Sequence, residues 1–178
     1  MIDRCYDQKE LVALSDLLNS GGPDWDYYFA LAARIVGAEK APARVLDAGC
    51  GTGALALEAL SRGALSATLI DNSNAALSTA RANAASLDET DAVTLLRADA
   101  RHPPTATLAH TLVFLDPPYG KDRAPEAIRG LDAAGWIAQG ALIAVETGRT
   151  EDLDLPEGFT LEDQRRYGRA KISLVTKD

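Results

Sequence analysis

The feature that most constrains the fold is the alternation, from about residue 44 onward, of short apolar runs with alanine-rich runs. Short apolar runs bounded by polar or glycine residues are typical of buried strands, and the longer runs between them suit helices. Apolar strands that alternate with helices indicate a parallel sheet covered on both faces. We predict strands over Arg44–Asp47, Ala67–Asp71, Val93–Ala98, Thr111–Asp116 and Ala141–Glu146, and helices over Ala54–Arg62, Ser73–Ser86, Ala124–Gly130 and a short piece near Leu131–Trp136.

The end of the chain follows a different pattern. The last two strand-like runs, Thr160–Tyr167 and Lys171–Thr176, are separated only by Gly168 and Arg169. This link is too short for a crossover helix, so the pair must form an antiparallel hairpin. The sequence therefore predicts a three-layer α/β fold with a mostly parallel seven-stranded sheet over residues 44–178. Residues 1–43 are predicted to form a helical extension packed on this domain.

Composition narrows the class of protein. The chain has 178 residues, a net charge of −8 and a pI of about 4.8, which argues against binding nucleic acid through bulk charge. A local basic patch remains open, although the same side chains could equally form a solvated face. Its candidate residues are Arg165, Arg166, Arg169, Lys171, Lys121 and Arg123.

Other classes of protein are disfavoured by what the sequence lacks. No apolar run approaches the ~20 residues of a membrane span, and the first residues do not have the shape of a signal peptide. Two cysteines are too few for a disulfide framework, and neither histidine has a metal-ligand spacing with them. We therefore expect a cytoplasmic protein without a membrane partner or a metal.

A glycine-rich turn, Asp47-Ala48-Gly49-Cys50-Gly51-Thr52-Gly53, lies between the first predicted strand and helix. Glycines allow a sharp turn and a close approach of ligand to backbone, and the helix N-terminus adds amide donors. Asp47 would suit an ammonium group and repel a pyrophosphate, and Asp71 ends the next strand, where a carboxylate can accept ribose hydroxyls. Cys50 has no recognisable base nearby, so we interpret it as a small turn residue rather than a nucleophile.

A second motif, Asp116-Pro117-Pro118-Tyr119, follows the fourth predicted strand. Ligands of open α/β sheets bind beyond the carboxyl ends of the strands, so this motif and the glycine turn should open onto one crevice. The two prolines stiffen the loop and remove two donors, which leaves the Asp116 carboxylate and the Pro117 carbonyl as acceptors. Acceptors suit an –NH2 group, and Tyr119 offers a flat face for a planar amide or base.

Together the two motifs resemble the class I S-adenosylmethionine-dependent methyltransferases, and Asp/Asn-Pro-Pro-Tyr is the signature of those that act on adenine N6, guanine N2 or glutamine amides. The resemblance implies a Rossmann-like fold and the cofactor S-adenosylmethionine. By the resemblance, Asp116, Pro117 and Tyr119 would hold the amine. The cofactor would be held by Asp47, Gly49, Gly51, Asp71, Asn72, Asp99 and Ala100, with Asp99 and Ala100 at the adenine.

Five segments narrow the resemblance to the bacterial 16S rRNA guanine-N2 methyltransferases. They are Gly53–Ala64, Val113–Lys121, Gly135-Trp136, Ala141–Glu146 and Arg165–Gly168. The resemblance implies that the partner is 16S rRNA or a small-subunit assembly intermediate. Residues 1–43 depart from the family's usual basic opening, being acidic on balance, and Asp47 stands where the family usually has Phe. Two alternatives stay open: an N-methyltransferase of a small molecule or protein glutamine, and a cofactor-binding module without turnover.

Overall fold

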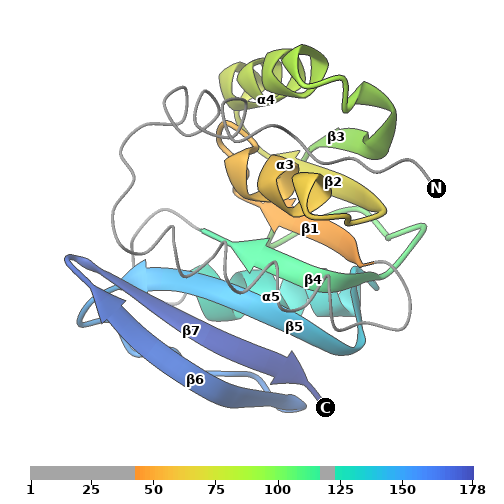
Figure 1. Cartoon of the computed structure of the whole chain (residues 1–178). Helices are drawn as coiled ribbons and strands as arrows, with labels where there is room; N and C mark the ends of the chain where they lie inside the picture. The colour runs from red at the N-terminus through yellow and green to blue at the C-terminus, as the bar shows by residue number, and fades with distance from the viewer. Residues whose placement is uncertain (1–42, 117–122) are drawn as a thin grey trace.

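A computed structural model of the protein describes residues 43–116 and 123–178. Elements carry the labels of Figure 1. The expected N-terminal helical extension, together with Pro117 and Tyr119, lies outside the described residues.

Seven strands form one sheet in the order β3-β2-β1-β4-β5-β7-β6 (Figure 1). Strands β1 to β5 pair in parallel, whereas β7 runs antiparallel to both β5 and β6. This arrangement confirms the predicted α/β fold and its C-terminal hairpin. The strands span Arg44–Ala48 (β1), Ser66–Asp71 (β2), Val93–Arg97 (β3), His110–Leu115 (β4), Ile137–Gly148 (β5), Phe159–Tyr167 (β6) and Ala170–Lys177 (β7).

Helices cover both faces of the sheet, as fully apolar strands require. Helices α3 (Ala54–Ser61) and α4 (Asn74–Ser86) pack on one face, and α5 (Arg123–Ala133) packs on the other (Figure 1). Neighbouring strand residues therefore enter different cores: Val45 joins the cluster under α3 and α4, and Leu46 joins the cluster under α5. No helix in the described part of the chain is long and apolar enough to cross a membrane.

Two element boundaries differ from the prediction. Helix α5 continues to Ala133 and the chain then turns at Gly135, which has φ 82°, so the separate short helix expected near Leu131–Trp136 is wrong. Strand β5 begins at Ile137, four residues before the predicted start at Ala141. Gln139 is polar and Gly140 has no side chain, so together they interrupt the apolar pattern. In the structure Gly140 has φ 70°, and the pairing of β5 with β4 shifts register over this stretch.

Candidate active site

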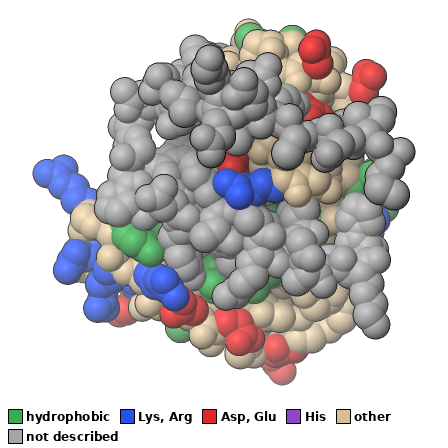
Figure 2. Space-filling model, viewed as in Figure 1, with side chains coloured by type: hydrophobic (Ala, Val, Ile, Leu, Met, Phe, Trp, Pro, Cys, Tyr) green, Lys and Arg blue, Asp and Glu red, His purple; other side chains and the backbone are tan. Residues whose placement is uncertain are grey.

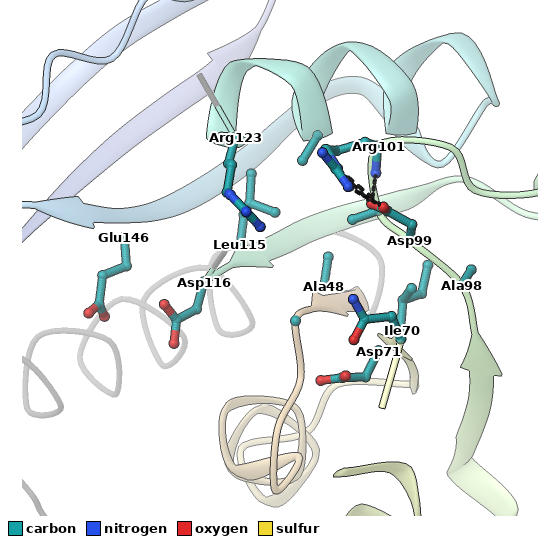
Figure 3. A pocket seen from close by; sticks show the side chains of 14 residues that line it. Ala48, Ile70, Asp71, Ala98, Asp99, Arg101, Leu115, Asp116, Arg123 and Glu146 are labelled. Atoms are coloured by element: carbon teal, nitrogen blue, oxygen red, sulfur yellow. Dashed lines mark hydrogen bonds and ion pairs between the residues drawn. The ribbon is translucent and has the colours of Figure 1, made fainter. Parts of the chain in front are cut away.

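A pocket of about 390 Å³ opens at the carboxyl edge of the parallel strands (Figure 3). The ends of β1, β2, β3, β4 and β5 and the start of α5 form its wall. Within the sheet, β2 and β3 lie on one side of strand β1, and β4 and β5 lie on the other side of it. The pocket therefore lies where the strand order reverses, the usual ligand site of open α/β sheets.

The glycine-rich turn is bonded to strand β2. The amides of Gly49 and Cys50 both donate to the carbonyl of Ile70, at 2.8 and 3.2 Å. Gly53 has φ 79°, and a Cβ there would lie 2.7 Å from Cδ2 of Leu69, so this position requires glycine. Gly49, with φ 84°, forms part of the pocket wall. The turn is thus a rigid part of the pocket, consistent with the prediction of a backbone surface for a ligand.

Asp71 ends β2, lines the pocket and also binds two backbone amides. Its Oδ2 accepts a hydrogen bond from the Gly51 amide at 3.1 Å, and its Oδ1 accepts one from the Ser73 amide at 2.8 Å. Ser73 is in turn the N-cap of α4 and accepts from the Ala76 amide. A carboxylate oxygen has two lone pairs, so each oxygen of Asp71 keeps the capacity to accept a further bond from a ligand.

Asp47 lies behind the pocket rather than on its wall. Its side chain is only 2% exposed, and Oδ2 accepts a hydrogen bond from the Ala56 amide in α3 at 3.3 Å. Burial raises the pKa of Asp47 to about 7; the hydrogen bond opposes this rise, and the charges of Asp116 and Asp71 add to it. Asp47 therefore supports the pocket from behind, through the hydrogen bond that joins the end of β1 to α3.

Asp116 and Glu146 form the acidic end of the pocket. The Asp116 amide donates to the Ala48 carbonyl at 3.2 Å, which ties the start of its loop to β1. Figure 3 shows the two carboxylates, one directly after β4 and the other on β5, pointing toward the same side of the pocket. Asp116 is exposed within the open pocket. Desolvation by the surrounding protein, with the nearby charge of Glu146, raises the pKa of Asp116 to about 7.

Asp99 and Arg101 form the opposite end of the pocket (Figure 3). Arg101 donates from Nη2 to Oδ2 of Asp99 at 2.6 Å and from Nε to Oδ1 at 3.0 Å, and its backbone amide donates to Oδ1 at 2.9 Å. These bonds lower the pKa of Asp99 to about 2, so this carboxylate is ionised at neutral pH. Arg101 also lies 3.7 Å from Glu126 of α5, which connects the loop after β3 to that helix.

The structure brings most of the predicted site residues together. Gly49, Asp71, Asn72, Asp99, Ala100 and Asp116 line the pocket. Asp47 and Gly51 do not line it but support it from behind. Cys50 is buried, which raises the pKa of its thiol and so disfavours the nucleophilic thiolate.

Three charged residues of the wall, Glu146, Arg101 and Arg123, were not among the predicted site residues. The rule that identified Asp71, a polar residue at the carboxyl end of a parallel strand, also fits Glu146. Arg101 follows Asp99 by two residues, but no sequence signal reveals that it folds back onto that carboxylate. Arg123 is the first residue of α5, and from the sequence it was a candidate only for the local basic patch.

Known proteins with this fold define the class. A structure from Haemophilus influenzae described as a candidate methylase has a TM-score of 0.76 and 26% identity, covering 87% of this chain and 99% of that one. A candidate methyltransferase from Escherichia coli has a TM-score of 0.74 and 29% identity, covering 90% of this chain and 89% of that one. The fold, the pocket and these matches identify an S-adenosylmethionine-dependent methyltransferase with a Rossmann-like domain.

Within that class, the chain belongs to the family described as conserved hypothetical protein 95, whose model matches residues 32–176. It is similar to the ribosomal RNA small subunit methyltransferase D of Escherichia coli strain K12, with 34% identity over 144 residues, 76% of this chain and 69% of that protein. The resemblance drawn from the two motifs and the five further segments is thereby confirmed at the level of the family.

Proposed function

We propose that this protein methylates the exocyclic N2 amine of one guanine in 16S rRNA. The named relative, a ribosomal RNA small subunit methyltransferase, supports the choice of RNA. The observation that carries the choice of base is the pair of carboxylates, Asp116 and Glu146, at one end of the pocket. An rRNA substrate also implies a cytoplasmic site of action. For residues 1–43 the proposal is still a helical extension.

The pocket fits the cofactor of this class. Its volume of about 390 Å³ lies within the range of small-molecule sites. Acidic side chains on and behind the wall create a negative field that favours a ligand with ammonium and sulfonium charges. S-adenosylmethionine, when bound, supplies a methyl group on a positively charged sulfur. We propose that Asp71 and Asn72 hold its ribose, that Asp99 and Ala100 hold its adenine, and that Gly49 gives it room beside the backbone.

The acidic end of the pocket suits guanine better than adenine. The edge of guanine carries two adjacent donor groups, the N2 amine and the N1–H, and two carboxylates can accept from both. Adenine carries an amine next to an unprotonated ring nitrogen, whose lone pair would face a carboxylate and be repelled. A site built to pair with a donor discriminates strongly against an analogue that lacks it, because its own polar groups are then left without a partner.

Asp116 then has two roles in this proposal. By accepting a hydrogen bond from the amine, its carboxylate directs the nitrogen lone pair toward the methyl group, and alignment of this kind can be worth about 7–11 kcal/mol. When the nitrogen gains its new carbon it must lose a proton, and a carboxylate with a pKa of about 7 can accept that proton near neutral pH. Pro117 and Tyr119 would complete the grip on the base as an acceptor and a stacking surface.

The proposal is tested by incubating the protein with tritiated cofactor and either deproteinised 16S rRNA or a small-subunit particle that lacks the modification, followed by nucleoside analysis. The expected product is N2-methylguanosine, formed by the wild type and not by Asp116→Ala. Label in an adenine nucleoside, in a protein glutamine or in a small amine would replace the proposed acceptor. Cofactor binding without transfer to any of these would indicate a module without turnover.

A further inference from the structure

Four exposed arginines gather where the β6–β7 hairpin turns: Arg149, Arg165, Arg166 and Arg169. We call this set the arginine edge. Figure 2 shows basic side chains gathered at the left of the molecule, where Figure 1 places the hairpin turn. For a chain with a net charge of −8 this is a local reversal of sign.

The arginine edge lies on the same side of the sheet as the pocket. Strand β7 starts where β5 ends, with Ala170 opposite Gly148, and β5 supplies Glu146 to the pocket wall. Neighbouring strands lie about 4.8 Å apart, so β6 is only about 10 Å from β5 in the plane of the sheet. The Arg149 amide donates to the Arg169 carbonyl at 2.8 Å, and its Nη1 donates to the Gly168 carbonyl at 3.0 Å. These bonds hold the turn against the end of β5.

The arginines differ in whether they form ion pairs with acidic side chains of the protein. Arg165 forms an ion pair with Asp163 at 3.0 Å. Lys171, considered with these residues from the sequence, is only 3% exposed and donates to the Glu151 carbonyl, so it belongs to the interior of the hairpin. Within the described residues, neither Arg166 nor Arg169 takes part in an ion pair. Arg166 and Arg169 are therefore the best placed to receive an external anion.

The rest of the charge distribution makes such a surface necessary for an RNA substrate. Asp71, Asp116 and Glu146 make the pocket acidic, and a polyanion is repelled both there and by the net charge of the chain. An RNA can deliver a base into the pocket only if its phosphates meet positive charge at the rim. Guanidinium groups bind phosphate with two parallel hydrogen bonds, which favours arginine for this contact.

We propose that the arginine edge binds the phosphate backbone of single-stranded RNA beside the target base, an inference that rests on the proposed function. Single-stranded RNA is favoured because a base must leave its stack to reach an enclosed pocket. Arg166 and Arg169 contact phosphates directly, and Arg149 adds charge while holding the turn in place.

The test compares two double variants that remove the same charge. Arg166→Ala with Arg169→Ala changes the edge, whereas Arg81→Ala with Arg129→Ala removes two exposed arginines from α4 and α5. The affinity of each for a single-stranded 16S rRNA fragment is measured by fluorescence anisotropy as salt is varied. For two lost phosphate contacts on a single strand, the slope of log K against log salt should become shallower by about 1.4 in the edge variant only. Its affinity should fall about 25-fold at 0.1 M salt.

Two further measurements separate the possible outcomes. The affinity for S-adenosylhomocysteine should be the same in all variants, and Arg166→Lys with Arg169→Lys should restore most of the salt slope. Equal slopes for the edge and control variants would overturn the arginine edge while leaving the proposed function intact. If the edge variant lost binding to poly-glutamate but kept its binding to RNA, the arginine edge would be a surface for an acidic protein. That result would also overturn the proposed contact with RNA. Failure of the wild type to methylate any RNA would instead count against the proposed function.

Discussion

At the scale of single residues, the site combines two carboxyl groups of raised pKa with a carboxylate that stays ionised. Burial and the charges of neighbouring carboxylates raise the pKa values of Asp47 and Asp116 to about 7, whereas Arg101 keeps Asp99 ionised. Perturbed pKa values of this size are typical of functional sites. In this protein they suit the pocket to a ligand that brings both positive charge and N–H donors.

Replacing Asp116 with alanine should lower kcat by about 10²–10³-fold, the usual cost of losing one oriented hydrogen-bonding group at a reacting centre. The affinity for S-adenosylmethionine, measured by calorimetry, should stay within a few fold. Asp116→Asn keeps an acceptor oxygen and should retain part of the rate. An Asp116→Ala rate equal to that of the wild type would remove this residue from the reaction.

Cofactor binding at pH 7 should release protons. Asp47 and Asp116 have pKa values of about 7, so each is about half protonated in the free protein. A cation in the pocket favours the ionised carboxylates and lowers both pKa values, which expels up to about one proton in total. Calorimetry in buffers of different ionisation enthalpy measures this number. S-adenosylhomocysteine lacks the sulfonium charge and should release fewer protons; equal release by both ligands would argue against charge as the cause.

At the scale of elements, the pocket depends on how closely α5 packs against the loop after β3. Gly130 of α5 lies against Arg101, and a Cβ there would be 2.1 Å from the Arg101 carbonyl oxygen. Because Asp99, Ala100 and Arg101 all line the pocket, the position of α5 determines the shape of that end of it.

Gly130→Ala should therefore destabilise the protein although alanine is the better helix former. The gain in helix propensity is about 1 kcal/mol, whereas the overlap with a backbone atom must be relieved by moving the loop or the helix, which costs about 1–3 kcal/mol or more. Cofactor affinity should fall with stability. Ala133→Gly, at the exposed end of α5, is the control: it should cost stability without changing affinity. An unchanged cofactor affinity in Gly130→Ala would mean that this contact does not determine the conformation of the loop after β3.

Elements that bury a continuous apolar run could be predicted from the sequence, and those that depend on packing could not. Thr111–Asp116 was predicted closely because β4 is apolar nearly throughout, whereas the start of β5 was missed because Gln139 and Gly140 break the pattern. For the site, Asp71 and Asp116 were predicted because they follow apolar strands. The burial of Asp47 and the fold-back of Arg101 depend on side-chain direction and tertiary contact, which periodicity does not encode.

At the scale of the whole molecule, the sheet separates two charge regions along one edge. The pocket in the middle of the sheet is acidic, and the hairpin at its end carries the exposed arginines. An acidic pocket suits a cationic cofactor and an amine, and a basic rim suits a polyanion, so one fold can accommodate both. The proposed RNA substrate and the proposed docking surface follow from this separation.

Cofactor binding should stabilise the whole fold, because the pocket joins five strand ends and α5. At a ligand concentration 100 times Kd the stabilisation is about 2.7 kcal/mol, which for a chain of this size raises Tm by about 5–11 °C. Asp71→Ala should show a much smaller rise at the same ligand concentration, since charge-assisted hydrogen bonds are worth about 1.5–3 kcal/mol each. The quantity to compare is the increase in Tm on adding ligand. The Tm without ligand should itself be lower in this variant, because it loses the hydrogen bonds to Gly51 and Ser73.

The most direct measurement of the central claim is a crystal structure with S-adenosylhomocysteine bound. We expect the adenosine between Asp71 and the Ala98–Arg101 loop, with the sulfur directed toward Asp116 and Glu146. A ligand bound elsewhere on the chain, or bound in the pocket with its sulfur directed away from both carboxylates, would contradict the account.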